Sequence, residues 1–165
     1  MNDSGVAREI ICGIGEARLG LAGDVLRATL GSCIGIGLLW RKRGRCALAH
    51  CLLPETSVRP QTITAKYVSQ ALPSLLLLLK AHPDVYGEIE AIVAGGAQML
   101  GPESSAGTRS IGRLNSETAL KCLKEAGIRI VHLEVGGEAG RQIYIDCRTY
   151  DYSVRSIVTE GGPTP

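Results

Sequence analysis

The sequence predicts an α/β sandwich, a single domain of mixed, largely antiparallel strands with two main helices. Short apolar segments of strand length recur along the chain and are separated by Gly-, Pro- and Ser-containing turns. Two longer segments instead repeat apolar residues at helical spacing. With 165 residues, 45% of them apolar and 21% charged, the chain is long enough to bury one sizeable core.

The first part of the chain predicts four strands. The last two are joined by a basic turn, and a two-residue loop at Arg43–Gly44 makes them a hairpin in which His50 lies opposite Gly37. The first helix is expected within 63–81, where leucines form one apolar stripe. Pro73 lacks an amide donor, so we expect a kink or a restart there. The four predicted strands cover residues 7–14, 24–30, 33–40 and 46–53.

The second part begins with a strand at 88–94 that ends at Gly95–Gly96, followed by a Gly/Pro/Ser loop at 101–110. The second helix is expected to be capped by Asn115 or Ser116 and to end at Gly127. Three further strands are expected at 128–135, 141–147 and 153–158. The core thus covers about 7–158, and a Gly/Pro tail at 159–165 is expected to fray.

The composition argues against several functions. A net charge of +2 and few aromatic residues give no basis for nucleic-acid binding. The longest apolar run, Leu75 to Leu79, is too short to cross a bilayer, and the first ten residues do not resemble a signal peptide. Six cysteines follow no disulfide-framework spacing, which favours reduced thiols. We therefore expect a cytoplasmic protein without membrane insertion.

Cys33 and His50 are the candidate reactive residues. On an extended strand Cys33 shares its face with Gly35 and Gly37, which carry no side chains. A partner opposite Gly37 projects to that same face, so His50 would join Cys33. An ideal ladder would still separate the two by about 13 Å, because Gly37 is four strand positions from Cys33. Contact therefore requires the segment at 31–33 to bend.

Two interpretations of this pair stay open on residue patterns alone. A nearby imidazole can lower the pKa of a thiol and create an attacking thiolate, and the amides of Ser32 or Cys33 could stabilise an oxyanion. That chemistry suits cleavage of an amide, ester or thioester. Alternatively, both residues only pack in the core, as most cysteines do. A zinc site with Cys46 and Cys51 is disfavoured, since His50 and Cys51 project to opposite faces.

Four elements resemble the CheD family of chemoreceptor glutamine deamidases, in order and across roughly residues 7–158. The first is L-G-S-C at 30–33, followed by an apolar strand and A-H-x-x-L-P at 49–54. The other three are G-G-A-Q-M at 95–99, similar to G-G-A-N-M in the family; I-G-R-L-N at 111–115, similar to I-G-x-x-N; and G-G-E-A-G-R at 136–141, similar to G-G-x-x-G-R.

The resemblance implies an α/β sandwich with a papain-like Cys–His pair that converts receptor glutamines to glutamates. It implies that Cys33 is the nucleophile, His50 the general base and acid, and Thr29 the third polar residue. Hydrolysis of glutamyl methyl esters is a related possibility, and no cofactor or metal is implied. The other residues assigned to the substrate or oxyanion region are Gly31, Ser32, Gly95, Gly96, Asn115 and Arg141.

The same resemblance implies two protein partners. One is the cytoplasmic helical region of methyl-accepting chemotaxis receptors, and the other is a CheC-type phosphatase of the chemotaxis response regulator. The alternative to an enzyme is a non-catalytic binding module that regulates such a phosphatase. Because the chain carries both Cys33 and His50, the enzyme is the favoured hypothesis.

Overall fold

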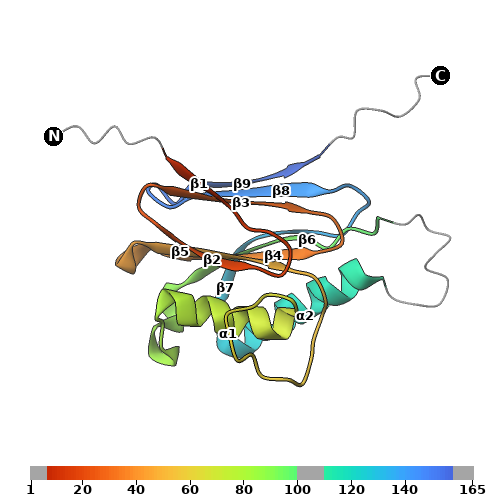
Figure 1. The fold of residues 1–165 in the computed structure, drawn as a ribbon, viewed down its shortest axis with the longest axis horizontal. Coiled ribbons are helices and arrows are strands. Elements are labelled where there is room, and N and C mark those ends of the chain that lie inside the picture. Colours follow the sequence, from red (N-terminus) through yellow and green to blue (C-terminus); the bar gives the residue numbers. More distant parts are fainter. Residues whose placement is uncertain (1–6, 100–109, 158–165) are drawn as a thin grey trace.

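The computed structural model describes residues 7–99 and 110–157, which form three layers. A four-stranded sheet stacks on a five-stranded sheet, and two helices cover the far face of the five-stranded sheet (Figure 1). The predicted α/β sandwich of mixed strands with two main helices is confirmed. In the described part of the chain, no helix is long and apolar enough to cross a membrane.

The outer, four-stranded sheet has the order β1-β3-β8-β9 and is mainly antiparallel. Only β1 and β3 run parallel to each other. One face of this sheet packs on the inner sheet through residues such as Leu26, Leu30 and Ile145, and the other face is open. Its strands are β1 (Arg8–Ile11), β3 (Asp24–Leu30), β8 (Arg141–Asp146) and β9 (Tyr152–Ser156).

The inner, five-stranded sheet has the order β2-β5-β4-β6-β7, with β6 and β7 parallel and the remaining pairs antiparallel. Its central strand β4 is buried at all seven positions, because one face meets the helices and the other meets the outer sheet. The strands are β2 (Ala17–Leu21), β4 (Ile34–Trp40), β5 (Arg45–Cys51), β6 (Glu90–Gly95) and β7 (Arg129–Val135).

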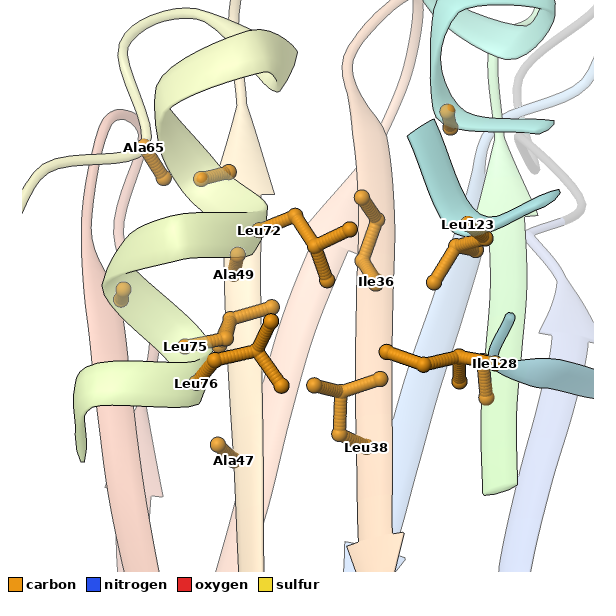
Figure 2. Packing of buried hydrophobic residues seen from close by; sticks show 14 of the residues in the cluster. Ile36, Leu38, Ala47, Ala49, Ala65, Leu72, Leu75, Leu76, Leu123 and Ile128 are labelled. Atoms are coloured by element: carbon orange, nitrogen blue, oxygen red, sulfur yellow. The ribbon is translucent and has the colours of Figure 1, made fainter. Parts of the chain in front are cut away.

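The two helices are α1 (Val68–Leu79) and α2 (Ile111–Ala126). Figure 2 shows Leu72, Leu75 and Leu76 of α1 directed toward the inner sheet, beside Ile36 and Leu38 of β4. Alanines of β5 lie under α1 and let the helix approach closely. The helical stripe read from the sequence is therefore the face that covers the sheet.

Side chains of the outer sheet occupy the space beside the two glycines of β4. A β-carbon at Gly35 would lie 2.8 Å from Leu30 Cδ1, and one at Gly37 would lie 2.6 Å from Ile145 Cδ1. Both distances are shorter than real β-carbon contacts, so these positions admit only glycine without rearrangement. The face of β4 that carries Gly35 and Gly37 is thus covered by two apolar side chains, one from β3 and one from β8.

The predicted two-residue hairpin loop is wrong. Residues Arg41–Arg43 form a 3₁₀ turn (η1) that Gly44 closes in the left-handed conformation, so the connection has four residues. A two-residue type I′ loop needs positive φ at both central residues. Arg43 does not adopt positive φ, whereas Gly44 does. The strands pair as Trp40 with Arg45, which brings Gly35 opposite His50 in place of Gly37.

Other differences from the predicted elements are local. The strand expected at 7–14 ends at Ile11, and β2 was missed, because the segment around Gly13 and Gly15 turns the chain from the outer to the inner sheet. Helix α1 does not restart at Pro73, since its buried leucines hold it on the sheet. A second 3₁₀ turn, η2 (Pro83–Glu88), precedes β6. The loop expected at 101–110, apart from Ser110, and the tail at 159–165 lie outside the described residues.

Helix α2 begins earlier than predicted. Ser110 is its N-cap and accepts a hydrogen bond from the Arg113 amide, so neither Asn115 nor Ser116 caps the helix. Both residues are instead buried within its first turns. The predicted cap was the wrong polar residue. Ser and Asn are both common N-cap residues, and the stretch before Asn115 has no apolar periodicity that would mark the helix as already begun.

A matched pair in α1 tests this packing. Leu75 is fully buried against the sheet, whereas Leu77 is 69% exposed on the opposite face. Leu75→Ala is expected to lower the free energy of unfolding by about 2–5 kcal/mol through lost burial and a cavity. Leu77→Ala is expected to change it by less than about 0.5 kcal/mol. Equal effects in urea-induced unfolding would contradict this orientation of α1.

Candidate active site

Cys33 and His50 lie on the same face of the inner sheet, toward the outer sheet. Cys33 belongs to the cluster of side chains between the sheets, and His50 lies directly opposite Gly35. Cys33 is two positions from Gly35, just before β4 begins. On an ideal ladder a residue at that position is the diagonal neighbour of His50, about 7–8 Å away. The corrected register therefore keeps both residues on one face and nearly halves the separation expected from the sequence.

The bend that the sequence required is present at residues 31–33. This turn carries the chain from β3 in the outer sheet to β4 in the inner sheet. The Gly96 amide donates a 2.8 Å hydrogen bond to the Cys33 carbonyl, and the Ala97 amide donates a 2.9 Å bond to the Gly31 carbonyl. The segment after β6 thus anchors the turn that carries the thiol.

Gly95 and Gly96 make this anchoring possible. Both adopt positive φ, and a β-carbon at Gly95 would lie only 2.4 Å from the Cys33 carbonyl oxygen. A side chain at either glycine would be strained and would displace its neighbours. The two glycines therefore act on the site through backbone geometry, beneath the turn at 31–33.

His50 is enclosed by the loop between β1 and β2. Its amide donates to the Glu16 carbonyl at 2.9 Å, and its carbonyl accepts from the Gly15 amide at 2.8 Å. Its ring Nδ1 lies 3.0 Å from the Cys12 carbonyl oxygen. A carbonyl can only accept, so Nδ1 carries the proton and Nε2 is left with the free lone pair of a base.

Burial sets the protonation of both residues. Cys33 is 6% exposed and His50 is 4% exposed. Burial raises the pKa of the Cys33 thiol above its ordinary value and outweighs the opposing effect of the residue's own backbone amide. Burial also lowers the pKa of His50, against the opposing effects of the Cys12 carbonyl and Glu16. At neutral pH the pair is a protonated thiol and a neutral imidazole.

The structure does not bring Thr29 to this pair. Thr29 is exposed and pairs with Gln142 of β8. Its neighbours Ala28 and Leu30 are buried between the sheets, so the Thr29 side chain projects from the opposite, outer face of its sheet. The group that orients the imidazole is the Cys12 carbonyl, which sequence reasoning missed because a backbone carbonyl is not marked by residue type.

Arg141 connects the two glycine turns near the site. Its Nη1 donates to the carbonyls of Gly95 at 3.1 Å and Gly136 at 2.7 Å, and its Nε lies 3.5 Å from a Glu134 carboxylate oxygen. These contacts hold the end of β6 against the turn that follows β7. Of the two roles that an arginine here could have, positioning a loop or contacting substrate, its observed bonds serve the first.

Asn115 lies at the junction of the two segments that carry the pair. Its side-chain Nδ2 donates to the Ser32 carbonyl at 3.0 Å and to the Leu52 carbonyl at 3.1 Å. Ser32 precedes Cys33, and Leu52 follows His50 by two residues. Asn115 is fully buried, so it can act only through these segments.

The cysteines beside His50 do not form a metal site with it. Cys46 lies between the sheets, whereas Cys51 packs on the helical side of the inner sheet. Within residues 7–99 and 110–157 there is no group of three or more His, Cys, Asp or Glu side chains that could hold a metal ion.

The fold and the site define an α/β sandwich with a buried cysteine and an oriented histidine on one face between two sheets. A family model described as CheD chemotactic sensory transduction matches residues 52–156. The chain belongs to the CheD family. The match begins two residues after His50 and does not include Cys33 or His50.

Curated relatives extend the similarity over most of the chain. A probable chemoreceptor glutamine deamidase CheD of Bdellovibrio bacteriovorus is 39% identical, over 87% of this chain and 92% of that protein. A probable chemoreceptor glutamine deamidase CheD of Pyrococcus abyssi is 37% identical, over 93% and 94%. Another, designated CheD 2, from a Ruegeria species is 32% identical, over 90% and 92%.

The protonation of the pair can be tested without substrate. Because burial raises the pKa of the Cys33 thiol, its alkylation by iodoacetamide should still increase as the pH rises beyond about 8.5, the ordinary thiol value. Peptide mass mapping separates Cys33 from the other five cysteines, and Cys33→Ser is the blank. A rate already constant below neutral pH would indicate a preformed thiolate–imidazolium pair and contradict this account.

Proposed function

We propose that this protein is a chemoreceptor glutamine deamidase that works through Cys33 and His50. The observation that carries the proposal is the shared face of the two residues, with the His50 Nδ1 proton held by the Cys12 carbonyl. The names of the relatives, chemoreceptor glutamine deamidases, supply the substrate class. The enzyme is an amidohydrolase acting on glutamine side chains of receptor cytoplasmic helices.

In the first half-reaction the Cys33 thiol attacks the carboxamide carbon of a glutamine side chain. His50 Nε2 accepts the thiol proton as the carbon–sulfur bond forms, and then donates it to the leaving nitrogen, so that ammonia departs. The product is a thioester between Cys33 and the former glutamine. A neutral thiol–imidazole pair suits this step, because the proton starts on sulfur and ends on ammonia.

The second half-reaction reverses these roles. His50 Nε2 accepts a proton from water, whose oxygen attacks the thioester carbon, and the thiol of Cys33 leaves with that proton. The product is glutamate. The amides of Gly31, Ser32 and Cys33 donate no hydrogen bond to an acceptor of another described residue, which supports the Ser32 and Cys33 amides as donors to the oxyanion.

The reaction should depend on both residues. Wild-type protein is expected to release ammonia from a receptor cytoplasmic fragment, and Cys33→Ala should abolish release. His50→Ala should lower kcat by about 10²–10⁴-fold. Cys122→Ala, at a half-buried cysteine on α2, is the matched control and should keep the wild-type rate. Ammonia release by Cys33→Ala at the wild-type rate would contradict the mechanism.

The pH profile of kcat/KM follows from the pKa of His50. Only the neutral imidazole can accept the thiol proton, so activity should fall as the pH drops through the pKa of His50. Burial lowers that pKa, so this acid limb should have its midpoint below about 6.5, the ordinary histidine value. A midpoint well above that value would contradict the buried, neutral state of His50.

The same groups could also hydrolyse a glutamyl methyl ester, with methanol leaving in place of ammonia. A methylated receptor fragment and methanol detection distinguish this activity from deamidation.

A CheC-type phosphatase is the second proposed partner. If the protein were a binding module alone, Cys33→Ala would bind that partner as well as wild type does, and wild type would release no ammonia.

A further inference from the structure

Asn115 makes two hydrogen bonds that join the two catalytic segments. Its side chain is fully buried, and its Nδ2 group donates to the carbonyl beside Cys33, that of Ser32, and to the Leu52 carbonyl just beyond β5. Its Oδ1 is also buried and has no hydrogen-bond partner in the described part of the chain. The two N–H groups of Nδ2 therefore hold the Asn115 side chain in place.

Both partners of Asn115 are carbonyl oxygens, which restricts the residue that can stand there. An aspartate would direct a carboxylate oxygen at both carbonyls, and a leucine would leave both carbonyls without this donor. An asparagine amide supplies two N–H groups from one nitrogen, so one planar group can bind both segments at once. Helix capping does not account for this residue, since Ser110 caps α2.

Helix α2 is itself seated closely on the segment that anchors Cys33. A β-carbon at Gly112 would lie 2.5 Å from the carbonyl oxygens of Gly96 and Ala97. The amides of those same two residues donate to the carbonyls of Cys33 and Gly31. The start of α2, the segment at 95–97 and the turn at 31–33 therefore form one packed unit, with Asn115 extending it to the end of β5.

We propose that Asn115 is the positioning residue of the catalytic pair: its amide fixes the separation of the Cys33 thiol from His50 Nε2 by binding the two segments that carry them. The proposal rests on the proposed function for its catalytic consequence. It does not require Asn115 to touch substrate. Loss of the amide should loosen the turn at 31–33 relative to the end of β5, while the pairing of Ile34 with Cys51 in the ladder remains.

The kinetic test compares variants normalised to titratable Cys33. Asn115→Leu and Asn115→Asp should lower kcat for ammonia release by about 10–100-fold with little change in KM, because misplacement of reacting groups affects the chemical step. Thr118→Val is the matched control, since it removes a side-chain bond within α2 to the Leu114 carbonyl and touches neither segment. A kcat for Asn115→Leu equal to that of Thr118→Val would overturn the proposal.

A second measurement needs no substrate and tests the positioning if deamidation itself is not found. In the wild type, His50→Ala should slow alkylation of Cys33 by iodoacetamide near neutral pH. In the Asn115→Leu background, or in Asn115→Ala if the leucine variant does not fold, His50→Ala should have little further effect. An equal slowing in both backgrounds would overturn the proposal. The absence of any His50 effect in wild type would count against both the pair and its positioning.

Discussion

The site depends on the register between β4 and β5. Placing Gly35 opposite His50 puts the imidazole diagonal to Cys33 and on its face. A shift of one residue would turn His50 toward the helices, where Ala47, Ala49 and Cys51 now pack. A shift of two, to Gly37, would keep the face and lose the proximity. The turn at 41–44 and the burial of both faces of β4 hold the pairing at the register that the proposed chemistry needs.

Burial between two sheets then determines the electrostatics. Desolvation is the largest influence on both pKa values, and at His50 it outweighs the opposing effect of the nearby Glu16 carboxylate. The fold compensates with backbone groups. A carbonyl orients the imidazole, amides of the segment at 95–97 hold the turn that carries the thiol, and Asn115 joins that turn to β5. The precision of the site therefore comes mostly from main-chain contacts.

This reliance on the main chain explains what could be predicted from the sequence. The α/β sandwich with two main helices, strand β3 and the stripe of α1 follow from apolar periodicity, and the shared face of Cys33 and His50 follows from alternation. The pairing of His50 with Gly35 could not be read, because it depends on whether Arg43 or only Gly44 takes a left-handed conformation. The role of the Cys12 carbonyl could not be read either, since every residue has a carbonyl.

Asn115 and Thr29 show the same limit for side chains. Asparagine ahead of an apolar run reads as a cap, and only the start of α2 at Ile111 reveals that it lies inside the helix. The family resemblance implies Thr29 as the third polar residue, yet the strand alternation that buries Leu30 turns Thr29 outward. The role of Asn115 depends on where α2 begins, and that of Thr29 depends on which face of β3 is buried. Neither can be read from the type of the residue.

In the proposed mechanism Cys33 becomes covalently linked to the former glutamine during turnover. The most direct measurement is an acid quench during turnover of a receptor fragment, followed by mass analysis of the Cys33 peptide. The account predicts an adduct on Cys33 that equals the substrate peptide less one ammonia and disappears when turnover is complete. Continued ammonia release with no such adduct, and with the same rate in Cys33→Ser, would contradict it.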